Sequence, residues 1–283
     1  MKNIILTLTI VLLVMWAALW LLGRNDGYIA EKILYKAART YDKILTNPDA
    51  TPPMMLEAAA NDLKRVMKEY PDKEAANLAR MKLIELYMTS SKFREAIPLL
   101  DEIIAREAAN PERASKAIYM KALAYEKMGS WAMAVKEFEK LERGFSNTML
   151  GLQTPLYVAN HYRLNGQKEE AAAALDKAVS FYNNIHNANE GTTLGFISLT
   201  MLMETYGKFR LYEPAADVLE KMISAYPVDT AFVHVLPFID TIYIENLNDP
   251  ARALSVYETI YEKTAEEKIK AFTQGKIAEL KKQ

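Results

Sequence analysis

Three histidines are the first residues to consider for chemistry, because an imidazole can bind zinc or transfer protons near neutral pH. His161, His186 and His234 lie far apart in the chain. None of them belongs to a His-x-x-x-His or Glu-flanked pair that would hold a metal on one helix face. His161 is expected to pack or to line a groove, and His186, in an Asn-rich stretch, is expected to be exposed. The sequence predicts no metal site and no catalytic histidine.

Adjacent carboxylates are the next candidates for acid–base chemistry. Asp101-Glu102 and Glu266-Glu267 stand beside Lys or Arg on presumed helix faces. Such runs are typical of solvated faces with i,i+4 ion pairs. Glycoside hydrolysis needs two carboxylates that converge on a cleft, and nothing in the sequence marks such a pair. We therefore predict that the chain is not an enzyme.

Glycine, cysteine and charge content exclude further classes. Of ten glycines, Gly129 and Gly166 are single turn glycines and do not form a phosphate-binding loop. The absence of Cys excludes thiol nucleophiles, Cys-ligated metals and disulfides. A net charge of −1 argues against a basic nucleic-acid surface. We expect no cofactor and no nucleic-acid partner.

The N-terminal segment is apolar enough to cross a membrane. Ile4 to Leu22 carries no charge, and this length of helix covers about 28 Å, close to the hydrocarbon thickness of a bilayer. Trp16, Trp20 and Tyr28 lie towards one end, where aromatic rings suit the headgroup layer. A cleaved signal peptide is the alternative, but its apolar region is usually shorter and ends at a small-x-small site. The sequence predicts an uncleaved anchor over residues 1–24.

Two membrane orientations of this anchor are possible from the sequence. Arg24, Lys32, Lys36 and Arg39 follow the apolar run and only Lys2 precedes it, so the positive-inside rule places the large domain in the cytoplasm. The short tail with an immediate Lys is instead similar to a bacterial signal-anchor, whose downstream domain is exported. We favour export: a single-pass protein of the inner (cytoplasmic) membrane with an extracytoplasmic, periplasmic domain.

The remaining chain repeats one pattern. A small residue is followed four positions later by an aromatic residue or Leu, and this pattern recurs at intervals of 37, 38, 37, 44 and 38 residues. The leading alanines are Ala59, Ala96, Ala134, Ala171, Ala215 and Ala253. A period of this size is typical of stacked helical hairpins.

Each later unit carries a second, earlier helix with its own signature. Ala122, Tyr125, Gly129 and Trp131 precede one leading alanine, and Ala159, Tyr162 and Gly166 precede the next. Small residues let two helices approach, and Gly suits the left-handed position where the first helix ends. These residues resemble the tetratricopeptide repeat. The resemblance implies an all-α fold: an N-terminal transmembrane helix, then a right-handed α-solenoid of about six hairpins over residues 28–263, then a C-terminal capping helix over residues 264–283.

The expected hairpins cover residues 28–71, 74–110, 112–147, 152–188, 194–227 and 229–263. The first unit departs from the family pattern because it lacks the Gly and is interrupted by Pro48, Pro52 and Pro53. The stretch Asn183–Thr193 is expected to lengthen one connection. A single N-terminal span followed by such repeats is similar to membrane-anchored repeat proteins of the bacterial envelope.

In the tetratricopeptide family the first helix of each hairpin lines an inner groove that holds a peptide or a helix. Mapped onto this chain, the resemblance implies partner-binding candidates, each of which could instead contact a neighbouring hairpin. They are Tyr119, Glu126, Lys127, Asn160, Arg163, Glu204, Lys208 and Phe238. The carboxylate-gripping clamp of the family's chaperone-binding members is not expected, because Leu156 occupies a place where that clamp needs a cation.

The leading hypothesis is a membrane-tethered scaffold that binds a protein or peptide partner at the cell envelope, in protein export, folding or envelope assembly. A tether raises the effective concentration for partners at the membrane. The first alternative is a self-associating structural module, a homo-oligomer that the anchor only holds in place. The second is a cytosolic-facing membrane adaptor, which follows if the anchor is reversed.

Overall fold

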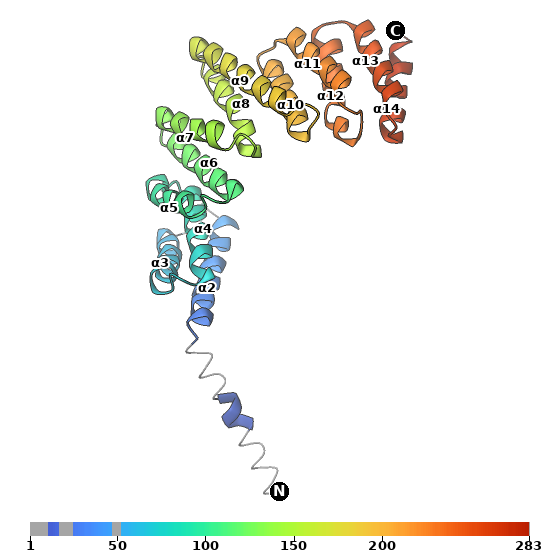
Figure 1. Ribbon diagram of the computed structural model, residues 1–283. Helices are drawn as coiled ribbons and strands as arrows, with labels where there is room; N and C mark the ends of the chain where they lie inside the picture. The colour runs from blue at the N-terminus through green and yellow to red at the C-terminus, as the bar shows by residue number, and fades with distance from the viewer. Residues whose placement is uncertain (1–10, 17–24, 47–51, 283) are drawn as a thin grey trace, which may run out of the picture. The chain divides into compact units, whose positions relative to one another are not determined.

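The computed structural model describes residues 11–16, 25–46 and 52–282 (Figure 1). Every regular element in these ranges is helical, which confirms the predicted all-α class. None of the helices they contain has the length and apolar character needed to span a bilayer. Residues 1–10 and 17–24, which make up most of the predicted anchor, lie outside the described residues.

The helices follow one another with bounds close to those of the expected units. They are α2 (Asp26–Thr46), α3 (Pro53–Glu69), α4 (Glu74–Thr89), α5 (Phe93–Arg106), α6 (Pro111–Lys127), α7 (Trp131–Gly144), α8 (Met149–Leu164), α9 (Lys168–Ala188), α10 (Thr193–Lys208), α11 (Tyr212–Ala225), η1 (Thr230–His234), α12 (Leu236–Ile239), η2 (Asp240–Asn246), α13 (Pro250–Lys263) and α14 (Glu267–Leu280).

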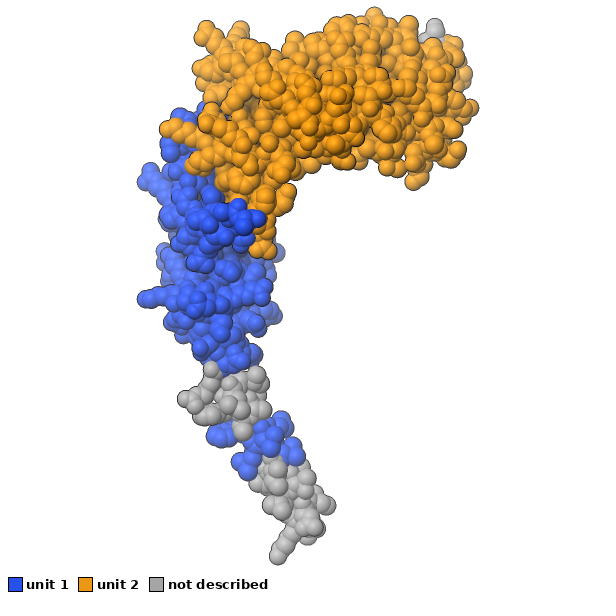
Figure 2. All heavy atoms as spheres, in the orientation of Figure 1, with its two compact units in different colours: residues 1–109, 120–134 blue, residues 110–119, 135–283 orange. Residues whose placement is uncertain are grey.

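Two compact units divide these helices (Figure 2). One unit contains residues up to 109 and residues 120–134, and the other contains residues 110–119 and 135–283. Helices α6 and α7 therefore contribute residues to both. The repeat array over 28–263, its handedness and the separate cap over 264–283 stay predictions.

The six leading alanines are the close-packing positions of the fold. All of them lie within the first two turns of a second helix and have 4% or less of their surface exposed. Within the first unit, α3 contacts both its partner α2 and the next first helix α4. Within the second unit, α9 contacts both α8 and α10 in the same way. A methyl side chain at these positions lets the second helix approach its neighbours without leaving a void.

One backbone feature marks the end of five first helices. A residue with positive φ, between 52° and 72°, stands five positions before each of the last five leading alanines. These residues are Ser91, Gly129, Gly166, Arg210 and Asn248. The predicted left-handed role of Gly129 and Gly166 is confirmed. The other three residues adopt the same turn without the freedom of glycine, so residue identity alone reveals only part of the repeat.

The expected long connection at Asn183–Thr193 is wrong. Helix α9 continues to Ala188, so only residues 189–192 connect it to α10. The Asn183 Nδ2 donates to the Val179 carbonyl oxygen at 3.0 Å, one turn back along α9. The 44-residue spacing therefore reflects a longer second helix. Tertiary packing of the C-terminal part of α9 overrides the low helix propensity of its Asn residues.

The last hairpin also differs from the expected regular pair. Its first arm is a 3₁₀ turn, a short α-helix and a π-helix in succession, η1, α12 and η2. The Leu247 N–H donates to the Ile242 carbonyl oxygen, five residues back, at 2.9 Å. Helix α14 follows α13 and buries Ile269, Thr273 and Leu280. Lys276 of α14 pairs with Asp240, the first residue of η2, at 2.5 Å.

Candidate functional site

The predicted groove residues all lie on first arms of hairpins. In the first unit, Glu126 and Lys127 are the last two residues of α6. In the second unit, Tyr119 lies on α6 and Phe238 on α12. Helix α8 carries Asn160 and Arg163, and helix α10 carries Glu204 and Lys208. Their exposure differs widely. Lys127, Arg163 and Lys208 are exposed, and the other five are partly buried. The first helices therefore offer a mainly polar surface, and the cations are its most accessible part.

Tyr119 takes part in an aromatic cluster. Its ring centroid lies 5.8 Å from that of Phe138 on α7 and 6.2 Å from that of Tyr157 on α8. Phe138 and Tyr157 are themselves 5.2 Å apart. Tilted and edge-on contacts at these distances stabilise packing between helices. Tyr119 thus connects neighbouring helices of its unit, and its ring is only partly accessible to a partner.

Asn160 and Arg163 form a preorganised pair on α8. The guanidinium donates two hydrogen bonds to the Asn160 Oδ1, from Nε at 3.1 Å and from Nη2 at 2.7 Å. It also lies over the ring of Phe209, the residue that follows α10, at 6.0 Å from the centroid. An exposed cation–π contact of this kind stabilises by about 0.5–1 kcal/mol. These contacts restrict Arg163 and leave donors available for a ligand.

Helix α10 places Glu204 and Lys208 one turn apart, next to α8. The two helices contact each other, and the Arg163–Phe209 contact joins their C-terminal ends. We name Asn160, Arg163, Glu204, Lys208 and Phe209 the α8–α10 surface. It offers two cations, a carboxylate, an amide and an aromatic ring. Such a surface can bind an extended chain of mixed charge, and it contains no nucleophile–base pair.

Phe238 lies apart from this surface. It is partly buried and packs against the hydrophobic core of the second unit. Its helix α12 is only four residues long and leads directly into the π-helix η2. Phe238 therefore contributes to the hydrophobic packing of the last hairpin as well as to its accessible face.

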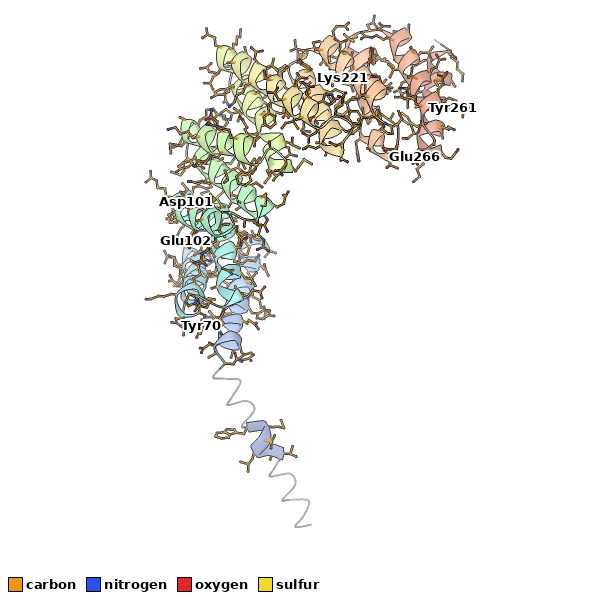
Figure 3. All side chains as sticks on the ribbon, viewed as in Figure 1. Tyr70, Asp101, Glu102, Lys221, Tyr261 and Glu266 are labelled. Atoms are coloured by element: carbon orange, nitrogen blue, oxygen red, sulfur yellow. The ribbon has the colours of Figure 1, made fainter. Side chains whose placement is uncertain are left out.

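The adjacent carboxylates Asp101 and Glu102 do not converge on a cleft. Both lie on α5 (Figure 3), and each pairs with a cation of a different neighbouring helix. The Asp101 Oδ1 lies 2.6 Å from the Nζ of Lys121 on α6, and the Glu102 Oε2 lies 2.9 Å from the Nε of Arg80 on α4. The ion pairs thus join helices, whereas the sequence predicted pairs within one helix.

The three histidines lie on α8, α9 and η1. Within the ranges that the structure describes, no group of three or more His, Cys, Asp or Glu side chains could hold a metal ion. The expected exposure of His186 is wrong, because this residue is 1% exposed near the end of α9. Its Nδ1 lies 3.2 Å from the Tyr226 hydroxyl. Burial, with a contribution from the nearby charge of Lys221, lowers the pKa of His186.

Sequence reasoning missed an ion-pair cluster around Arg252 on α13. Its guanidinium lies 2.7 Å from Glu213, 3.6 Å from Asp217 and 2.9 Å from Glu220, three carboxylates on one face of α11. The same guanidinium covers the ring of Tyr243 on η2 at 5.2 Å. The spacing of the carboxylates, i, i+4 and i+7, could have indicated one acidic face but not its partner. The cluster joins the last two hairpins.

Sequence reasoning also missed the role of Tyr182. Its fully buried hydroxyl donates to the Leu152 carbonyl oxygen at 2.8 Å and accepts from the Leu156 N–H at 3.2 Å. These two backbone groups would bond to each other in a regular α-helix. The hydroxyl is inserted between them directly after Pro155, which has no N–H. Burial raises the pKa of Tyr182 well above its usual value, so it stays a donor.

Comparison with known proteins supports the repeat at one place in the chain. Residues 116–148 match the tetratricopeptide repeat model, so the resemblance is confirmed for the unit formed by α6 and α7. No curated protein sequence matches the chain significantly.

Several solved structures are similar at low identity. A putative kinesin light chain with TPR-like repeats from Podosopora anserina is 18% identical, covers 71% of this chain and 96% of its own, and has a TM-score of 0.39. BtubC (BKLC) from P. vanneervenii is 14% identical over 89% of this chain and 87% of its own, with a TM-score of 0.36. A tetratricopeptide repeat protein from Parabacteroides merdae is 15% identical over 90% and 99%, with a TM-score of 0.31. At these scores we draw no conclusion from the similarities.

Proposed function

We propose that this chain is a membrane-tethered scaffold that binds a protein or peptide partner along the first helices of its repeats. The observation that carries the proposal is the α8–α10 surface. Two first helices of consecutive hairpins contact each other there, and they present exposed Arg163 and Lys208 beside a partly buried carboxylate and amide. The tetratricopeptide match at residues 116–148 supports it, because such repeats generally mediate protein–protein interaction.

The chemistry of this surface favours a partner with acidic side chains or a free carboxylate. Arg163 is held by Asn160 and by the Phe209 ring, so it loses little side-chain freedom on binding. Its remaining donors can pair with a carboxylate in a bidentate arrangement. Glu204 adds selectivity, because an acidic group placed against it would be repelled. Arg is also enriched among residues that dominate binding energies.

The tether in this proposal is the apolar segment Ile4–Leu22. It is uncharged and long enough to cross a bilayer. Confinement at the membrane would raise the effective concentration of the scaffold for partners located there. We further propose an extracytoplasmic, periplasmic location for the repeats, with a role in export, folding or envelope assembly. A reporter fused after Gln283 tests this orientation, and activity of a cytoplasm-specific reporter would support the reversed adaptor instead.

Site-specific photo-crosslinking in the full-length protein tests the binding surface. A photoreactive amino acid at Glu204 should form adducts with a partner, and the substitutions Arg163→Ala and Lys208→Ala together should reduce them by about tenfold or more. The matched control removes Lys168 and Lys221, exposed cations on the second helices α9 and α11 of the same hairpins. Equal adduct yields in both double variants would refute the α8–α10 surface.

The mass of the adducts distinguishes a partner from self-association. Adducts of exactly twice the chain mass would favour the structural homo-oligomer. Light scattering of the full-length protein in detergent, corrected for the detergent, provides an independent check. A monomer that still forms the hetero-adduct would support the scaffold.

A further inference from the structure

Helix α2 carries a stripe of cations on the face that points away from its own unit. Lys32, Lys36, Arg39 and Lys43 recur at i, i+4, i+7 and i+11, so they project from one side of the helix. Only one of them has a carboxylate partner among the described residues: Lys36 lies 3.0 Å from Asp62, and the Lys36 side chain is still 74% exposed. We name these four residues the α2 basic stripe.

The opposite face of α2 is the packed one. Its buried residues are Ala30, Ala37, Tyr41 and Ile44, and α2 contacts α3 and α4. On the helical wheel these residues lie about 80° or more from every cation of the stripe. The stripe is therefore not needed for the packing of α2, and its charges are available to an external partner.

Exposed aromatic residues accompany the cations. Tyr35 is 65% exposed and Tyr28 is 48% exposed, although burial of a tyrosine ring is favourable. The Arg39 guanidinium lies over the Tyr35 ring at 5.9 Å. Tyr35 and the four cations line one hollow of about 510 Å³. Exposed tyrosine rings suit the headgroup layer of a membrane, and exposed cations beside them are attracted to anionic lipids.

The position of α2 in the chain favours a lipid partner. Only residues 23–25 separate Leu22, the end of the proposed anchor, from Asp26, where α2 begins. Even a fully extended chain of this length spans no more than about 14 Å. A helix that starts so close to the hydrocarbon boundary and lies along the surface keeps all four cations within a Debye length, about 8 Å, of the headgroups.

We propose that the α2 basic stripe binds the anionic phospholipid headgroups of the membrane that holds the chain, so that α2 lies along the bilayer surface. This rests on the proposed tether, which delivers the stripe to the bilayer. The stripe then adds an attraction that depends on lipid charge, about fivefold in the ratio of bound to free helix for each cation. The anchor holds the chain at the membrane, and the stripe orients its first unit against it.

The test uses the full-length chain, which has no native Cys to interfere with labelling. Thr40→Cys places a fluorophore in the hollow lined by the stripe, and Glu95→Cys on α5 places it on a different exposed helix. Each labelled protein is reconstituted into vesicles of phosphatidylcholine alone or with one third phosphatidylglycerol. The lipids carry a headgroup quencher. The label at position 40 should be quenched only with phosphatidylglycerol, and high salt should abolish the effect.

Charge variants identify the residues responsible. The single substitution Lys43→Gln should reduce the bound-to-free ratio of α2 about fivefold, and the quadruple Gln variant of the stripe should abolish quenching. The matched control replaces Lys268, Lys270, Lys281 and Lys282 on and after α14 by Gln, with the same loss of charge, and should retain it. Quenching that is equal in both quadruple variants overturns the proposal.

Flotation of the same samples distinguishes failure of the proposed lipid binding by the stripe from failure of the proposed tether. If the chain floats with both lipid mixtures but the position-40 label is never quenched, the tether is supported and the lipid-binding role of the stripe is overturned. An acidic protein would then be the partner to test. A chain that does not float with phosphatidylcholine overturns the tether. In that case, the lipid-binding role of the stripe is still supported if the unmodified chain floats with phosphatidylglycerol vesicles and the quadruple Gln variant does not.

Discussion

Replacement of Gly129 by alanine should destabilise the protein although the new methyl group meets no other atom. Gly129 has a φ of +71°, and a Cβ built there has no neighbour within 4 Å. The left-handed conformation costs an L-residue about 1–2 kcal/mol. The lower entropy of the unfolded alanine chain offsets about 0.5–1 kcal/mol of this cost. The expected net loss is about 1 kcal/mol, which comes entirely from the backbone.

The reverse substitution should stabilise the equivalent turn. Arg210 has a φ of +59° at the same distance from its leading alanine, so Arg210→Gly removes the strain that Gly129→Ala introduces. We expect a gain of about 0.5–1 kcal/mol. Asn248→Gly should gain less, because Asn tolerates the left-handed region better than Arg.

Thermal and urea unfolding followed by circular dichroism measure these changes. A change of 1 kcal/mol shifts Tm by about 2–4 °C in a chain of this size. The matched control is Gly275→Ala, inside helix α14, where the Cβ also has no neighbour within 4 Å. This variant should be more stable by up to about 1 kcal/mol, because alanine favours a helix. If Gly129→Ala also stabilised the protein, the assigned turn would be wrong.

Three further predictions concern the second unit. Gly151→Ala should destabilise by about 2 kcal/mol or more, since its Cβ would lie 2.0 Å from the Phe145 carbonyl oxygen; denaturant unfolding measures the loss. Tyr182→Phe should cost about 2 kcal/mol and speed exchange of a backbone amide in α8, because two backbone groups lose their partner. Tyr206→Phe should be neutral, because the Tyr206 hydroxyl makes no hydrogen bond within the part of the chain that the structure describes. His186 has a lowered pKa, so its unfolded form binds the proton more readily and stability should fall as pH drops below about 6.5. The variant His186→Gln should lack this component, and an identical pH dependence of both proteins would contradict the assignment.

The helical hairpins could be predicted because their period is carried by packing. A buried alanine recurs in each second helix, and a small side chain there allows the helices to pack closely. The turns could be predicted only where glycine occupies them. Ser91 and Arg210 adopt the same φ although their residue types do not indicate it, and Asn248 belongs to a type that only tolerates it better. The geometry at these turns is imposed by the helices on either side.

The candidate surface was harder to predict, because exposure depends on neighbours that the sequence does not reveal. Arg163 and Lys208 are exposed, and Tyr119 is partly covered by rings from two other helices. For His186 the sequence predicted exposure, but the residue is buried. An Asn-rich surrounding suggested a loop, but tertiary contacts extend α9 and bury the ring. Local composition fails wherever a distant helix supplies the packing.

The near-zero net charge conceals how differently the cations are used. Arg80 and Lys121 are almost buried and bind carboxylates of α5, and Arg252 binds three carboxylates of α11. Removal of Asp101 or Glu102 would leave a nearly buried cation without its carboxylate, and the Arg252 pairs join two hairpins, so we regard all of them as structural. The α2 basic stripe is the opposite case, since its cations are exposed and mostly without a carboxylate partner among the described residues. The cations that make the membrane orientation ambiguous in the sequence are largely those that share this face. Cations that bind headgroups can do so on either side of the membrane. The number of these cations therefore does not by itself decide on which side the repeats lie.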